Sequence, residues 1–81
     1  MTEAQIKEVI LKVLGRIAPE ADLDTLDPDA NVREALDLDS FDHLTLLIGL
    51  HEALGVDIPE ADYGQLTTLA NILRYLAARV H

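Results

Sequence analysis

The sequence predicts an all-α fold: a bundle of three main helices and one short helix, with a long loop between the first two. Two stretches near the ends of the chain repeat apolar residues at helical spacing, and a third lies between the capping pair Asp39-Ser40 and Gly55. We find no stretch with the alternation of apolar and polar residues that is typical of a half-buried strand. The length of 81 residues fits one domain, placed at residues 1–81.

The first helix is predicted between Thr2 and Pro19. Thr2 and Gln5 have the spacing of a capping box, and Pro19 provides the stop. The apolar residues of this stretch occupy one face of a 3.6-residue period: Ile6, Val9, Ile10, Val13, Leu14 and Ile17. From Pro19 to Asp39 the sequence predicts a long loop. Four apolar residues are expected to anchor it: Leu23, Leu26, Val32 and Leu36.

The second helix is predicted over residues 40–54, because Asp39 or Ser40 can cap its start and Gly55 can end it in the left-handed conformation. After Pro59 we expect one short helical turn over residues 60–63. Thr67 or Thr68 then caps the last helix. Its apolar face has the same period as that of the first: Leu69, Ile72, Leu73, Leu76, Ala77 and Val80.

The charge of the chain is concentrated in its middle. The net charge is −9, and residues 20–62 carry thirteen acids against Arg33 alone. Apolar residues are interleaved with these acids, so we expect a folded acidic surface and not a disordered segment. Nucleic acid is excluded as a partner, because neutralising phosphates needs Lys and Arg. A partner with a basic surface is favoured instead.

The composition of the chain and the spacing of its histidines predict its cellular location and the lack of a metal site. Cysteine is absent, which excludes disulfides and thiolate metal sites and fits the cytoplasm. No apolar run approaches the roughly 18 residues of a membrane span, and Met1 is not followed by the basic region of a signal peptide. His43, His51 and His81 are not paired at metal-ligand spacing, so no metal site is predicted. We expect a cytoplasmic monomer.

The second helix has two apolar faces. One face is expected to join the core: Leu46, Leu47, Leu50, Ala53 and Leu54. The opposite face carries Phe41, Leu44 and Ile48 together with Thr45 and Glu52. Either the long loop covers this second face, or it is an exposed strip on which partners dock. The acids around it are Asp37, Asp39, Asp42 and Glu52.

Ser40 stands at the start of this helix. A serine there is usually a cap, and no His-Asp relay can be read from the spacing, so no catalytic residue is predicted. The helical wheel places His43 toward the core, where a packed histidine is expected.

The run Leu36-Asp37-Leu38-Asp39-Ser40-Phe41-Asp42-His43-Leu44, with Asp57-Ile58-Pro59 and Thr67-Thr68-Leu69 further on, resembles an acyl carrier protein. The resemblance extends over the whole chain, including its length, helix layout and acidic middle. It implies that a holo-carrier synthase, a phosphopantetheinyl transferase, attaches 4′-phosphopantetheine to Ser40, which follows Asp39. The arm then carries acyl groups as thioesters, and the protein itself catalyses nothing. The bundle is expected to shelter the acyl chain between its helices, as in the family.

The resemblance also implies a docking surface for acyl-transferring and acyl-modifying enzymes with basic surfaces. Its residues are Asp37, Phe41, Asp42, Leu44, Thr45, Ile48 and Glu52. Departures from the housekeeping pattern occur at Asp37, where glycine is common, and at Thr45 and His51, where acids are common. These departures favour a specialised fatty-acid, polyketide or lipid pathway.

Two alternatives stay open at this point. A peptidyl or aminoacyl carrier protein would have the same serine and the same fold. An unmodified acidic helical interaction module would use Ser40 as a cap alone.

Overall fold

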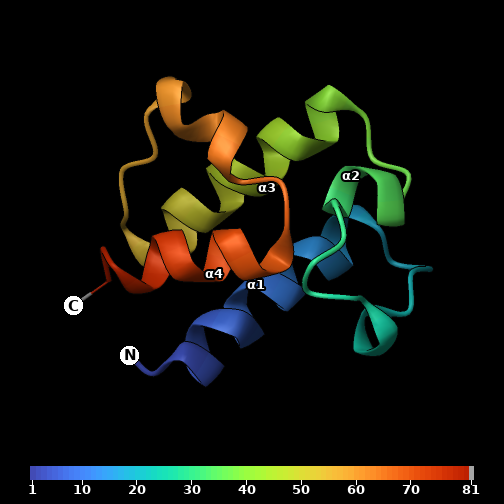
Figure 1. Cartoon of the computed structure of the whole chain (residues 1–81), viewed down its shortest axis with the longest axis horizontal. Helices are drawn as coiled ribbons and strands as arrows, with labels where there is room; N and C mark the ends of the chain where they lie inside the picture. The colour runs from blue at the N-terminus through green and yellow to red at the C-terminus, as the bar shows by residue number, and fades with distance from the viewer. Residues whose placement is uncertain (81) are drawn as a thin grey trace.

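A computed structural model describes residues 1–80; His81 lies outside the described residues. Over this range the elements are α1 (Glu3–Ile17), the 3₁₀ turn η1 (Leu23–Thr25), α2 (Val32–Ala35), α3 (Ser40–Leu54), the 3₁₀ segment η2 (Glu60–Gln65) and α4 (Leu69–Ala77). The all-α fold with three long helices is confirmed (Figure 1). None of the helices within residues 1–80 is both long enough and apolar enough to cross a bilayer.

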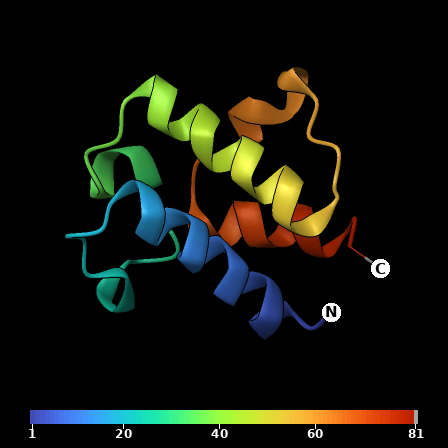
Figure 2. The same ribbon diagram turned by 180° about the vertical axis from the view of Figure 1, so that it is seen from behind.

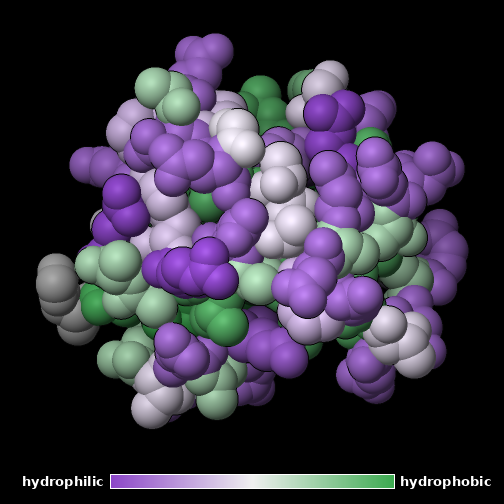
Figure 3. All heavy atoms as spheres, in the orientation of Figure 1, coloured by the Kyte–Doolittle hydropathy of each residue, from purple (hydrophilic) through white to green (hydrophobic). Residues whose placement is uncertain are grey.

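Helix α1 packs against both α3 and α4. Seen from behind, α1 and α3 lie side by side and run in opposite directions (Figure 2). The core between the three helices is formed by side chains that are almost fully buried: Ile6, Ile10, Leu14, Leu46, Leu47, Leu50, Ile72 and Leu76. Hydrophilic residues cover most of the face shown in Figure 3, as expected of a chain with this charge.

Helices α1 and α3 are in close contact at Gly49. A Cβ atom at this position would lie 2.8 Å from Cγ1 of Val13. Val13 is itself buried on α1, so the two backbones can come this close because Gly49 has no side chain. Gly49 therefore sets the spacing of the two helices at this point.

Helix boundaries follow the capping residues. Thr2 and Gln5 form the predicted reciprocal box at the start of α1, with the Gln5 amide donating to Thr2 Oγ1 at 3.2 Å. The predicted bounds of α3 are confirmed, and Gly55 ends it with a φ of 67°. Of the two candidate caps for α3, Asp39 takes the role and Ser40 is the first helical residue.

The connection between α1 and α3 is more structured than the loop that the sequence predicts. It contains η1 and the four-residue α2, which Asn31 caps. Val32 is fully buried, and its amide donates to the Thr67 carbonyl at 2.8 Å. The Ala70 amide donates to the Pro28 carbonyl at 2.9 Å. These bonds fasten the connection to the start of α4, which is why it lies against the bundle.

Three further expectations are corrected. Helix α4 ends at Ala77, and a tight turn follows in which the Arg79 amide donates to the Leu76 carbonyl at 3.0 Å. Val80 therefore lies beyond the helix, although it still packs against the core. Ala53 is exposed, because it lies at the edge of the apolar face of α3. The short turn after Pro59 is the longer η2.

Gly49→Ala is expected to lower the free energy of unfolding by about 1–3 kcal/mol, the usual cost of adding a methyl group to a filled core. Val13 is β-branched, so its helical rotamer leaves it little freedom to move aside. In a Val13→Ala background the same substitution should instead raise stability by up to about 1 kcal/mol, because alanine is the better helix former. Urea unfolding of the parent, the two single variants and the double variant measures this coupling. Equal effects of Gly49→Ala in both backgrounds would contradict it.

Candidate functional site

Ser40 is exposed at the first position of the fifteen-residue helix α3. Its neighbour Asp39 makes the cap: Asp39 Oδ1 accepts from the Asp42 amide at 2.8 Å, and Asp42 Oδ2 accepts from the Asp39 amide at 3.4 Å. This reciprocal box satisfies the start of the helix with carboxylates. The hydroxyl of Ser40 is therefore not required as a cap and is accessible to a reagent from solution.

A group attached to Ser40 would lie at the positive end of the α3 dipole. The unsatisfied amides of a first helical turn favour an anion such as a phosphate ester. The carboxylates of Asp39 and Asp42 lie at the same end and oppose a second negative charge. The side chain of Ser40 is therefore suited to covalent attachment, where the ester bond holds the anion, and less suited to binding free phosphate.

The chain enters this position through an unusual backbone conformation at Asp37. Asp37 has a φ of 55°, the left-handed region that favours glycine. The Leu38 amide donates to the Arg33 carbonyl at 2.8 Å, which closes a Schellman motif at the end of α2. Leu38 is buried, so the motif fixes the direction in which the chain approaches Asp39 and Ser40.

The second apolar face of α3 is open to solvent. Phe41, Leu44 and Ile48 are 73%, 37% and 47% exposed. The α1–α3 connection does not cover them, since it is fastened to the start of α4. Thr45 lies among them and donates its hydroxyl to the Phe41 carbonyl at 3.0 Å. We call the surface formed by Phe41, Leu44 and Ile48 the α3 strip.

The acids expected around the α3 strip lie at its two ends. Asp37, Asp39 and Asp42 are near the start of α3, and Glu52 is in its last turn. Asp42 is half-buried by the capping box, and the other three are exposed. An apolar centre with charged ends is the pattern of a protein-docking surface.

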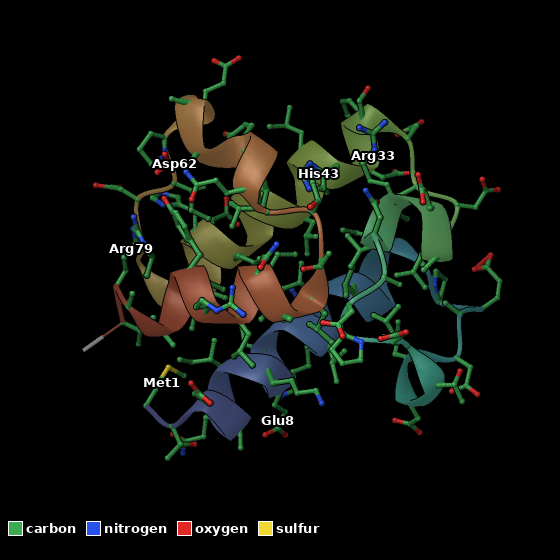
Figure 4. All side chains as sticks on the ribbon, in the orientation of Figure 1. Met1, Glu8, Arg33, His43, Asp62 and Arg79 are labelled. Atoms are coloured by element: carbon green, nitrogen blue, oxygen red, sulfur yellow. The ribbon has the colours of Figure 1, made fainter. Side chains whose placement is uncertain are left out.

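The two histidines of α3 have structural partners. His43 is buried, and its ring Nε2–H donates to the Leu66 carbonyl at 2.7 Å, which ties the first turns of α3 to the segment before α4 (Figure 4). This confirms the packed histidine that the sequence predicts. His51 is exposed and donates from Nδ1 to the Val56 carbonyl at 2.7 Å. Within residues 1–80 no group of histidines and acids is arranged to hold a metal ion.

One pocket lies at Asp37, ahead of α3, and another lies along α3 at His51. The larger one, about 800 Å³, lies between the end of α1 and the α1–α3 connection and has four carboxylates on its walls, Glu20, Asp22, Asp27 and Asp37. The smaller one, about 280 Å³, lies between α3 and the segment 57–63, and we call it the α3–η2 pocket. Its lining is mostly apolar and consists of Leu47, Ile48, His51, Asp57, Ile58, Pro59 and Tyr63. The smaller pocket suits a hydrocarbon chain better, because the charged walls of the larger one favour water.

The sequence did not single out Ile58 and Tyr63 as part of a site. They lie in a stretch without helical periodicity, and their place opposite α3 depends on long-range packing. A tyrosine four residues after Pro59 was the available signal in the sequence, and the structure places it half-buried.

Comparison with known proteins gives concordant results. A family model described as a phosphopantetheine attachment site matches residues 4–76. The chain is 35% identical over 75 residues to an acyl carrier protein of Syntrophobacter fumaroxidans, covering 93% of this chain and 86% of the relative. It is 31% identical to an acyl carrier protein of Thermosynechococcus vestitus, covering 90% and 93%. The solution structure of a protein from Anaplasma phagocytophilum, described as an acyl carrier protein, is similar with a TM-score of 0.71. It is 26% identical, with 94% and 84% of the two chains covered.

Leu50→Ala is expected to lower the free energy of unfolding by about 2–5 kcal/mol, because Leu50 is fully buried and its loss leaves a cavity. Ile48→Ala, on the opposite face of α3, should change it by at most about 0.5 kcal/mol, as exposed positions do. Urea unfolding of the two variants beside the parent makes the comparison. A loss in Ile48→Ala as large as that in Leu50→Ala would show that the α3 strip belongs to the core.

Proposed function

The chain belongs to the acyl carrier protein family, and we propose on this basis that Ser40 is the residue that carries its 4′-phosphopantetheine arm. Proteins of this family hold acyl groups on the arm and are carriers, not catalysts. The observation that supports Ser40 is the exposed hydroxyl at the start of α3, next to an aspartate that already caps the helix. Residues 1–81 then serve as one carrier domain.

Attachment needs a separate transferase, because no base within residues 1–80 is placed to activate Ser40. In the transfer, the Ser40 hydroxyl oxygen forms an ester bond to the phosphorus that bears the pantetheine, the pyrophosphate bond of coenzyme A breaks, and adenosine 3′,5′-bisphosphate leaves. His43 is three residues further along the helix, but it is buried with its ring nitrogen donating to the Leu66 carbonyl. The proton of the hydroxyl therefore goes to a base of the transferase.

The α3 strip is the surface on which we expect that transferase and the later acyl-transferring and acyl-modifying enzymes to dock. Its apolar side chains supply contact area next to Ser40, and the acids at its ends attract a basic partner. Docking there brings Ser40 to the partner's active site. A tethered thioester then reaches each enzyme at a high effective concentration.

The acyl chain is expected to occupy the α3–η2 pocket. Ile48 belongs both to the α3 strip and to the lining of this pocket, so the two features are adjacent on α3. A volume of about 280 Å³ with Leu47 of α3 and Ile58 of the following segment in its lining offers apolar contacts to a hydrocarbon chain. Burying the chain there would contribute a favourable free energy of about 25 cal/mol for each Å² of apolar surface removed from water.

The residues on and beside the α3 strip indicate the type of pathway. Thr45 and His51 occupy positions where the housekeeping members of the family commonly carry acids, so this surface is less negative than theirs. A partner selected for a strongly acidic surface would therefore bind it less well. We infer that the carrier serves a specialised fatty-acid, polyketide or lipid pathway.

Ser40→Ala is expected to abolish addition of the arm and to change stability by at most about 0.5 kcal/mol, because Asp39 keeps the cap. The measurement is the intact mass after incubation with coenzyme A and a phosphopantetheinyl transferase. Thr25→Ala, which removes an exposed hydroxyl of η1 outside the docking surface, is the control and should load normally. Addition of the arm to the Ser40→Ala variant, or to any residue other than Ser40 in the parent, would refute the assignment.

Ile48→Ala should reduce kcat/KM for arm loading by roughly fivefold or more, because it removes an apolar contact at the centre of the docking surface. Asp42→Asn keeps an acceptor for the capping box but removes a charge, so it should reduce kcat/KM at low salt and progressively less as salt is added. Glu3→Gln removes an acid of α1 and is the control for net charge alone. If Glu3→Gln slows loading as much as Asp42→Asn, loading depends on net charge alone and the proposal of a docking surface at the α3 strip is wrong.

A further inference from the structure

Tyr75 connects α4 to η2. It is a buried residue of α4, and its hydroxyl donates to Asp62 Oδ2 in η2 at 2.6 Å. A short bond from a hydroxyl to a carboxylate is among the stronger hydrogen bonds in proteins, because the acceptor is ionised. We call this contact the Asp62–Tyr75 tie.

Arg79 holds the ring that makes the tie. Its guanidinium carbon lies 3.6 Å from the centroid of the Tyr75 ring, and its Nη1 donates to the Tyr75 carbonyl at 3.2 Å. Figure 4 shows Arg79 and Asp62 at the same end of the molecule. Burial and the bond to Asp62 raise the pKa of Tyr75, although the charge of Arg79 lowers it in part. At neutral pH the hydroxyl therefore keeps the proton that it donates.

The residue that accepts this bond belongs to the segment that forms one wall of the α3–η2 pocket, although its own side chain does not line the pocket. Tyr63, which follows Asp62 directly, lines the pocket, and Pro59, three residues before Asp62, lines it as well. The Asp62 amide donates to the Pro59 carbonyl at 2.9 Å, so Asp62 and Pro59 belong to one turn. Fixing the Asp62 side chain to α4 therefore restrains the side of the pocket that faces Leu47 and His51 of α3.

We propose that the Asp62–Tyr75 tie limits how far this wall can move away from α3, and thereby the length of acyl chain that the pocket admits. The inference rests on the proposed function, because it takes the arm-borne acyl chain as the occupant. Asp62 and Tyr75 act as positioning residues, since they hold the wall. A short chain fits with the tie intact, whereas a longer chain requires the wall to move and the tie to stretch.

Tyr75→Phe is the variant that tests the tie, because it removes the hydroxyl and keeps a ring for Arg79 to cover. Asp62→Asn keeps an acceptor oxygen but removes the charge, so it should fall between parent and Tyr75→Phe. Ile72→Val, on the same helix and fully buried, is the matched control for a loss of stability that leaves the tie in place.

The first measurement uses cargo. Each variant is loaded with an acetyl or an octanoyl arm from the corresponding acyl-coenzyme A, and the thioesters are cleaved by hydroxylamine. Relative to acetyl, the octanoyl thioester of Tyr75→Phe should be cleaved at least about threefold more slowly than that of the parent, since a bond to a charged group can bias an equilibrium by tenfold or more. An unchanged ratio in Tyr75→Phe, or an equal change in Ile72→Val, would overturn the proposal.

The second measurement needs no arm and separates the two hypotheses. In the unmodified chain, amide hydrogen exchange over residues 57–65 should be about tenfold faster in Tyr75→Phe than in the parent, and unchanged in Ile72→Val. If the parent accepts no arm on Ser40 while this acceleration occurs, the proposed function fails and the tie itself is supported. If the arm is accepted but residues 57–65 exchange at the parent rate in Tyr75→Phe, the tie is refuted and the proposed function stands.

Discussion

The contact of α1 with α3 at Gly49 fixes the rotation of α3 about its own axis, and the use of each α3 side chain follows from that rotation. With Gly49 against Val13, Leu46 and Leu50 are directed into the core. The residues on the other side of the same helix then face solvent, which is why Ile48 is exposed. The exposed α3 strip is therefore a consequence of how the helices pack. Exposed apolar surface is unfavourable unless a partner covers it, and this strip lies beside the residue proposed to carry the arm.

At the start of α3, capping of the helix and covalent attachment are assigned to different residues. Carboxylates of Asp39 and Asp42 satisfy the backbone of the first turn, so the Ser40 hydroxyl is left for chemistry. The arrangement has an electrostatic cost, because both carboxylates repel the phosphate that the helix end would otherwise favour. The same two charges lie beside the surface on which we propose that a basic partner docks. If Ser40 carries the arm as proposed, these acids weaken the attraction of the helix end for the phosphate and strengthen the attraction for a basic partner.

The parts of the structure that the sequence predicts well are those determined locally. The bounds of α3 follow from Asp39 and Gly55, which act on the backbone within one turn, and the core face follows from the helical period. The failures depend on distant partners. Helix α2 exists where Val32 meets Thr67, and no local signal indicates that contact. The same holds for the bond of Tyr75 to Asp62, two residues whose spacing fits no periodic pattern.

The fastening of the α1–α3 connection to the start of α4 has a consequence for how the chain folds. The hydrogen bonds from Val32 to Thr67 and from Ala70 to Pro28 join residues that are 35 and 42 positions apart in the sequence. Helices form in about a microsecond or less, but such a contact must first overcome the entropy of closing the loop between its ends. The native topology of this small helical protein is therefore completed by a non-local step, and the folding rate should be slower than that of a bundle whose contacts are all between sequence neighbours.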